Sequence, residues 1–186
     1  MALGAGWLCL DFIRTLRHRG TDAVSEELAD PADLAAWVRQ CVPSAVGSAV
    51  PSADAARVGE ARRLREAVHQ LVQAARGPGG AGACGREALE CVNRAAARPV
   101  PTPSLDPSGG IRWRADDPVD AALSLVARDA LDLATSASAT RVRQCAGPLC
   151  GALFLDGSRP GTRRWCAMGV CGNAAKKQAL RTRSAR

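Results

Sequence analysis

Four cysteines near the C-terminus are the residues whose spacing is best suited to chemistry. Cys145 and Cys150 form one C-x4-C pair, Cys166 and Cys171 form a second, and fifteen residues separate the two pairs. Each pair can supply two sulfur ligands from one tight turn, and four thiolates complete the tetrahedral shell of a zinc ion. Because such a shell leaves no open position for water or substrate, the spacing predicts one structural Zn2+ rather than a catalytic metal.

Two structural disulfides are the alternative interpretation of these cysteines. They would suit an exported chain, but the apolar stretch Met1–Leu10 lacks the basic n-region of a secretory signal and runs directly into Asp11. We therefore expect a cytoplasmic protein, and in that reducing compartment clustered cysteines bind metal more often than they pair. The remaining cysteines have no ligand spacing and are expected to be thiols without metal; they are Cys9, Cys41, Cys84 and Cys91.

Most of the positive charge lies in the same segment as the paired cysteines. Residues 141–186 contain ten Lys and Arg and a single acid, Asp156, for a formal charge of +9. Residues 1–140 contain fifteen basic and seventeen acidic residues, for a formal charge of −2. A zinc ion with four thiolates would have a net charge of −2, which basic neighbours would offset. Most of the excess positive charge of residues 141–186 would remain after that. This asymmetry points to a polyanionic partner, and nucleic acid is favoured.

The first 140 residues show the periodicity of helices. The clearest segment has Leu64, Val68 and Leu71 on one face, with charged residues facing away. The Asp-Pro pairs at 30–31 and 117–118 are start signals, because the carboxylate can cap a helix and proline suits its first position. Helices are therefore expected over about residues 6–18, from 31 onward, and over 58–75, 86–97 and 119–134, with a loop over 43–54 and a small hairpin over 99–115.

The segment with the cysteine pairs is expected to form a small zinc finger. Residues 153–155 and 163–165 suit the two strands of a hairpin, and a helix is expected to begin at Cys171. The N-terminus of this helix would face the thiolates, which its dipole favours. We therefore predict a mainly α protein with two separate cores. A helical N-terminal domain with a small β-hairpin (1–140) precedes a treble-clef-like four-cysteine zinc finger (141–186).

The C-terminal segment carries a recurrent set of residues around its cysteines: Cys145 to Cys150, Leu153 to Asp156, Ser158-Arg159, Arg163 to Cys166, Met168, Cys171 to Asn173, and Ala175-Lys176. In residue types as well as in cysteine spacing, this set resembles the CGNR zinc finger over roughly forty positions. The segment before it carries Leu8 to Phe12, Thr15-Leu16, Asp33 to Trp37, Asn93-Arg94 and Val142 to Gln144. These residues resemble the ABATE domain. Together these resemblances imply a bacterial, mostly α-helical transcription regulator related to stress responses.

The chain departs from the family pattern at two positions. The family motif carries Arg after Cys-Gly-Asn, where this chain has Ala174, and usually carries Asn before Thr-Leu, where this chain has Arg14. If the family's arginine contacts a phosphate or a base, this chain should bind nucleic acid more weakly than its relatives. If that arginine braces the hairpin, little is lost.

Nucleic-acid binding is the leading functional hypothesis, with DNA favoured over RNA. A short helix can enter a major groove, and the two aromatic residues of the finger, Phe154 and Trp165, suit packing over the metal better than base stacking. A zinc-braced protein-interaction module that binds an acidic partner is the alternative. The candidate nucleic-acid contacts are Arg159, Arg163, Arg164, Lys176, Lys177, Arg181 and Arg183.

Enzymatic activity is not expected. The chain has only two histidines, His18 and His69, and no nucleophile–base pair can be assembled from its sequence. The helical domain is expected to act as a sensor or a homodimerisation unit, with no effector identified. Asp11 beside Arg14 is typical of a structural ion pair, and a small-ligand pocket lined by Trp7, Asp11 and Arg14 is the alternative. No apolar run is long enough to span a bilayer, so no membrane partner is expected.

Overall fold

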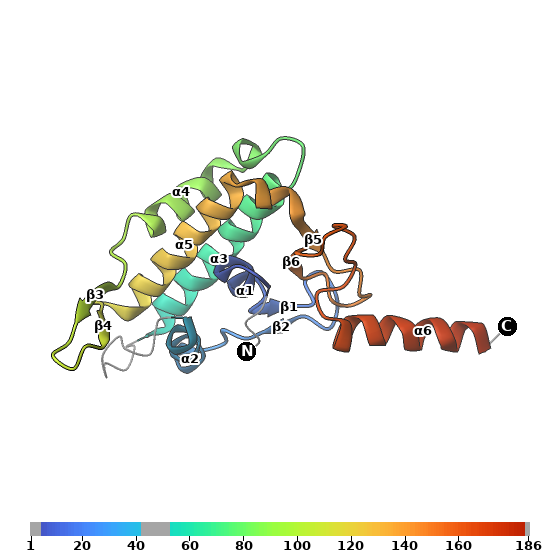
Figure 1. The fold of residues 1–186 in the computed structure, drawn as a ribbon, viewed down its shortest axis with the longest axis horizontal. Helices are drawn as coiled ribbons and strands as arrows, with labels where there is room; N and C mark the ends of the chain where they lie inside the picture. Colours follow the sequence, from blue (N-terminus) through green and yellow to red (C-terminus); the bar gives the residue numbers. More distant parts are fainter. Residues whose placement is uncertain (1–4, 42–52, 185–186) are drawn as a thin grey trace.

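The computed structural model describes residues 5–41 and 53–184, without the side chains of residues 179, 183 and 184. A helical body carries a small hairpin at one end and a finger with a projecting helix at the other (Figure 1). The helices are α1 (Leu8–Ile13), α2 (Pro31–Cys41), α3 (Ala55–Ala75), α4 (Arg86–Ala96), α5 (Pro118–Thr135) and α6 (Asn173–Ser184). The antiparallel strand pairs are β1 (Leu16–Arg17) with β2 (Ser25–Glu26), β3 (Thr102–Leu105) with β4 (Ile111–Arg114), and β5 (Val142–Gln144) with β6 (Leu153–Leu155). The shorter helical turns are η1 (Ala81–Ala83), η2 (Ala137–Arg141) and η3 (Met168–Gly172).

Carboxylate caps define where the main helices begin. Asp117 accepts hydrogen bonds from the backbone N–H groups of Val119 and Asp120 at the start of α5, and the next residue is the expected proline. Asp30 accepts from the N–H of Asp33 at the start of α2. Each cap pairs N–H groups that have no partner within the helix. The start signals expected at the two Asp-Pro pairs are therefore confirmed.

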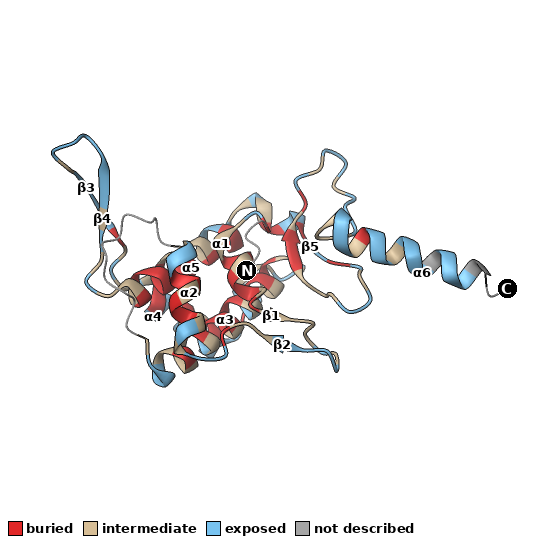
Figure 2. Ribbon diagram, turned by 90° about the horizontal axis from the view of Figure 1, so that it is seen from below, coloured by how far each residue is buried: buried red, intermediate tan, exposed pale blue. Residues whose placement is uncertain are grey.

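Helices α3, α4 and α5 pack along one another and enclose the main core, with α1 and α2 against them. Their buried sides face inward in Figure 2. Phe12 of α1 and Trp37 of α2 are both buried, and their ring centroids lie 4.8 Å apart. Leu64 of α3 and Leu123 of α5 complete the same core. The apolar face predicted from the periodicity of α3 is thus the buried face.

A buried arginine anchors the segment between α1 and α2 to α3. The side chain of Arg65 is only 3% exposed. Its guanidinium donates to both carboxylate oxygens of Glu26, at 2.6 and 2.7 Å, and to the hydroxyl of Thr15 at 3.1 Å. Because Thr15 precedes β1 and Glu26 lies in β2, this buried group holds the short β1–β2 pair against the helical body.

The finger and the helical body share one hydrophobic core. Val142 of β5 and Leu153 of β6 are buried in the same cluster as Leu10 and Leu123 of the helices. The backbone N–H of Leu155 also donates to the carbonyl of Ala5 at 2.9 Å. The expectation of two separate cores is therefore wrong, because the hairpin at the base of the finger packs against the body.

Two other expectations differ from the structure in detail. The first helix ends at Ile13, well before residue 18, because the chain turns into β1. Residues 163–165 form no strand, and β6 pairs with β5 instead. The loop expected over 43–54 lies mostly outside the described residues. Among the helices in the described ranges, none is both long and apolar enough to cross a membrane.

Candidate metal centre and basic surface

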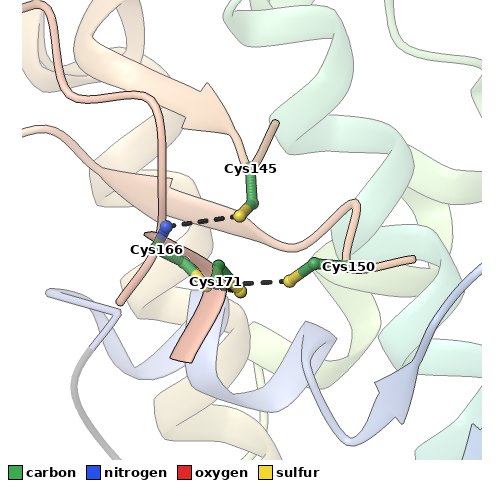
Figure 3. A group of neighbouring side chains, drawn as sticks. All are labelled: Cys145, Cys150, Cys166 and Cys171. Carbon is green, nitrogen blue, oxygen red and sulfur yellow. Dashed lines mark hydrogen bonds between the residues drawn. The ribbon is translucent and has the colours of Figure 1, made fainter. Parts of the chain in front are cut away.

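The four paired cysteines converge on one point between β5, β6 and η3 (Figure 3). Their sulfur atoms all lie within 4.8 Å of one another. The Sγ of Cys166 lies 3.6 Å from that of Cys150 and 3.7 Å from that of Cys171. These distances are far longer than the roughly 2.05 Å of a disulfide bond. They match the edge of a tetrahedron with metal–sulfur distances of about 2.3 Å, which is roughly 3.8 Å.

A tight turn after β5 presents the first pair of sulfurs. The backbone N–H of Cys150 donates to the carbonyl of Gly147 at 3.0 Å, which closes the turn. A Cβ atom at Gly147 would lie 3.2 Å from the Cβ of Cys150 and 3.5 Å from the Sγ of Cys145. Glycine therefore suits this turn, because a larger residue would press on the two ligand side chains.

Backbone amides stabilise the first sulfur as a thiolate. The Sγ of Cys145 accepts hydrogen bonds from the N–H of Cys166 at 3.4 Å and of Gly147 at 3.5 Å. Burial raises the pKa of Cys145, but these amide bonds outweigh it, and the pKa lies below its ordinary value. The pKa of Cys166 is raised to about 11, mainly by burial and next by its contact with the Cys150 thiol. A divalent cation at the centre would reverse that penalty, because it favours the charged form of each sulfur.

The last sulfur comes from the wide helical turn η3 rather than from α6 itself. Cys171 lies within η3, and α6 begins two residues later at Asn173. The side-chain amide of Asn173 donates to the carbonyl of Gly169 at 3.1 Å, which joins the two helical segments. The helix expected to open at Cys171 thus begins two residues later, after η3, and its positive N-terminal end lies beside the sulfurs.

Asp156 organises the loop that leads to Cys166, and its role was not foreseen from the sequence. Its carboxylate is fully buried and accepts from the hydroxyl and N–H of Ser158, at 2.6 and 3.0 Å, and from the N–H of Arg163 at 2.9 Å. The hydrogen bond from the Ser158 hydroxyl is the main cause that lowers the pKa of Asp156. An Asp followed two residues later by Ser is a local signal for such a turn.

Replacing Asp156 with alanine is expected to weaken metal binding without removing a ligand. The N–H groups of Ser158 and Arg163 would lose their acceptor, so the loop before Cys166 would no longer be held. Support residues of this kind typically change metal affinity by about 10- to 100-fold. Competition with a chromophoric chelator would measure the affinity, and Asp156→Asn, which keeps one acceptor oxygen, should lose less. Equal zinc affinity in all three proteins would contradict this role for Asp156.

The predicted nucleic-acid contacts fall into two groups. Arg163 and Arg164 are exposed but already engaged: the Arg163 guanidinium lies over the Phe154 ring at 5.0 Å and donates to the carbonyl of Trp165, and Arg164 lies over the Trp165 ring. In the described part of the chain, the other side chains of the set are exposed and make no hydrogen bond or ion pair. They are Arg159, Lys176, Lys177 and Arg181. The side chain of Arg183 lies outside the described residues.

Helix α6 projects away from the rest of the molecule (Figures 1 and 2). Lys177 and Arg181 are four residues apart and therefore share one face of it. Ala174, three residues before Lys177, is exposed at the start of the same helix. The free cations of the finger are thus concentrated on a helix that no other described segment covers.

The small-ligand pocket expected at Trp7, Asp11 and Arg14 stays a prediction, and the structure describes the contacts of each of the three residues. Trp7 packs against the core as the residue before α1. Asp11 accepts a hydrogen bond from the N–H of Ala5 at 3.0 Å and lies 3.9 Å from Arg14. Arg14 also lines a cavity between β1 and the finger in the described part of the chain.

Two family models match the chain. The ABATE model, described as "Putative stress-induced transcription regulator", matches residues 6–137. The CGNR zinc finger model matches residues 141–184, which include the four converging cysteines. No curated protein matches the sequence.

Proposed function

The chain belongs to the ABATE family and ends in a CGNR zinc finger, and we propose that it is a DNA-binding transcription regulator. In this proposal the helical domain comprises residues 1–140 and the finger residues 141–186. The finger contacts nucleic acid, the protein acts in the cytoplasm, and it has no catalytic activity.

One structural Zn2+ is proposed to be held by Cys145, Cys150, Cys166 and Cys171. The support is the set of sulfur–sulfur distances, which suits a four-thiolate tetrahedron, together with the amide bonds to Cys145. When bound, the metal would join the turn after β5, the loop after β6 and η3. Its role would be to position α6, because all four ligand positions would be occupied by the protein.

The uncovered basic helix is the observation that carries the proposal of DNA binding. Helix α6 has 12 residues and is therefore about 18 Å long, enough to cross a major groove about 12 Å wide. Lys176, Lys177 and Arg181 on this helix have no partner in the described structure and can contact phosphates. Binding of this kind releases counterions and becomes weaker as salt is added.

Removing one cation of α6 is expected to reduce the salt dependence of binding to duplex DNA. Lys177→Ala and Arg181→Ala should each flatten the slope of log affinity against log salt by about 0.9, the effect of one lost phosphate contact. Arg86→Ala is the control, because Arg86 is also exposed but lies on the helical body. Fluorescence anisotropy over a salt series would measure the slopes. Weak and salt-insensitive binding by all four proteins would rule out α6 as a nucleic-acid surface.

Introducing arginine at Ala174 is expected to tighten binding. This position is exposed, lies three residues before Lys177 and belongs to the same helix. An arginine there could make a bidentate contact, which would improve affinity by roughly 1–3 kcal/mol if it reaches a base edge. The same anisotropy titration would measure the change, with Ala174→Gln as the uncharged control. If both variants bind like the wild type, position 174 does not face the DNA.

A zinc-braced interaction module for an acidic protein is the second candidate function. It is favoured by apolar side chains around the metal centre: Leu149, Met168 and Val170 are 55%, 50% and 71% exposed. Exposed apolar residues beside basic ones suit a protein partner with an acidic rim. Pull-down after nuclease treatment distinguishes the two functions, because a discrete protein would then be retained without nucleic acid.

A further inference from the structure

A small cavity lies between the helical body and the metal centre. Its volume is about 40 Å³. The segment 13–19 around β1 forms one wall, His69 of α3 contributes to a second, and residues 150–153 of the finger form the third. The cavity therefore lies where the two parts of the chain meet, and the turn that carries Cys150 is part of its wall.

The charged groups that line this cavity are all basic or imidazole side chains. They are Arg14, Arg17, His18, Arg19 and His69. The carboxylates that pair with the arginines do not line it: Glu27 pairs with Arg17 and Glu66 pairs with Arg19. Burial lowers the pKa of His69, and the neighbouring Arg19 lowers it further, as expected for a cationic environment.

One donor of a residue that lines this cavity has no acceptor in the described structure, and a second is only weakly paired. The side chain of Arg14 is 18% exposed, and its Nη1 lies 3.9 Å from Oδ1 of Asp11, which is longer than a hydrogen bond. The Nε of Arg19 is a fully buried nitrogen with no hydrogen-bond partner among the described residues. Buried donors in native proteins are normally satisfied, and those that are not point to a missing water or ion.

We propose that this cavity binds a small oxyanion, a phosphate or carboxylate group that is free or carried by a small molecule. The arginine fork matches the two oxygens of either group, and charge-assisted bonds of this kind are the strong ones. A water site needs at least about 10–15 Å³, so this volume has room for a group of several heavy atoms. The basic wall favours an anion over water alone.

A bound oxyanion would join the finger to the helical body. His18 already makes such a link, because its Nδ1 forms a hydrogen bond with the carbonyl of Leu149, next to Cys150. His18 holds a left-handed backbone conformation (φ 54°), which residues other than glycine adopt infrequently. An anion between Arg14 and the backbone of residues 150–153 would add a second link at the same junction. The site therefore offers a position for a small-molecule signal to influence the finger.

The test is a phosphate titration of the full-length, metal-loaded protein, followed by isothermal titration calorimetry and by thermal unfolding. We expect saturable binding with one phosphate per chain and a rise in Tm that reaches a plateau. Potassium chloride at matched ionic strength is the blank, because phosphate also stabilises proteins non-specifically and without saturation. Acetate, run in parallel, distinguishes a carboxylate group from phosphate as the preferred ligand.

Two variants locate the site. Arg14→Gln removes the charge and should weaken phosphate binding by about tenfold or more. Lys177→Ala removes a cation of α6 and should leave phosphate binding unchanged, so the result is independent of whether α6 binds DNA. If Arg14→Gln does not fold, Arg14→Lys is used, which should keep one-to-one binding at reduced affinity.

Three results would overturn the proposal. Equal phosphate affinity in Arg14→Gln and the wild type would exclude Arg14 as a ligand. Loss of binding in Lys177→Ala would place the anion on the basic helix instead. A linear, non-saturable response to phosphate and to acetate in the wild type would mean that water satisfies the buried donors.

Discussion

Replacing Cys150 with serine is expected to abolish metal binding and to unfold the finger. Structural zinc contributes roughly 10–16 kcal/mol of apparent folding free energy in small four-ligand sites, and a serine hydroxyl does not replace a thiolate. Because Val142 and Leu153 lie in the core of the helical body, unfolding should also expose part of that core. The helical body should therefore remain helical but unfold at a lower urea concentration.

Metal analysis and urea unfolding followed by circular dichroism would measure both effects. Cys91→Ala is the control, because Cys91 lies on α4, away from the metal centre, and should retain one zinc per chain. The absence of zinc from freshly reduced wild-type protein would contradict the metal assignment. Unchanged stability of the body in metal-free Cys150→Ser would contradict the energetic importance of the shared core.

Replacing Arg65 with methionine is expected to destabilise the protein by about 3–5 kcal/mol at neutral pH. Removing one partner of a buried ion pair leaves the other charge without full compensation. In the variant, the Glu26 carboxylate would lose two short hydrogen bonds and the Thr15 hydroxyl would lose its donor. Arg63→Met is the matched control, because Arg63 is an exposed arginine two residues earlier on the same helix. Urea unfolding of the three proteins would measure the difference.

The effect of Arg65→Met should also depend on pH. Burial raises the pKa of Glu26, but hydrogen bonds from Arg65 outweigh it and place the pKa below its ordinary value of 4.5. A carboxylate whose pKa is lowered by folding stabilises the protein above its ordinary pKa and loses that contribution as the pH falls. The stability gap between wild type and variant should therefore narrow below about pH 4.5. A gap that is constant down to pH 3 would mean that the charge of Glu26 does not contribute.

Much of the fold could be predicted from the sequence because its signals are local. The Asp-Pro start signals and the apolar period of α3 act within one or two helical turns, and the structure confirms both. The glycine turn between β3 and β4 is equally local, and that hairpin forms where it was expected. The β1–β2 pair could not be predicted, because its two-residue strands have no period and depend on Arg65, some forty positions away.

For the metal centre too, the predictions that rest on local signals were correct and those that depend on packing were not. The C-x4-C pairs and the family motif were sufficient to predict that four sulfurs would meet, because each turn positions its own two cysteines. The strand partner of β6 was predicted wrongly. Residues 142–144 and 163–165 are both too short for their sequences to show which of them pairs with β6, and packing in the folded protein selects residues 142–144. Asp156 was missed for a related reason, because its burial depends on the closed finger.

The sequence by itself determined the helical class, the position of the finger, the set of four sulfurs and the concentration of charge in the last 46 residues. Tertiary structure alone decided that body and finger share a core, that Arg163 braces the backbone while Lys177 and Arg181 stay free, and that Arg14 and Arg19 meet at one cavity. The physical reason is the separation along the chain over which each kind of interaction acts. Caps, turns and periodic faces act between neighbours in the chain, whereas burial and pairing of a charged side chain depend on segments that only the folded core brings together.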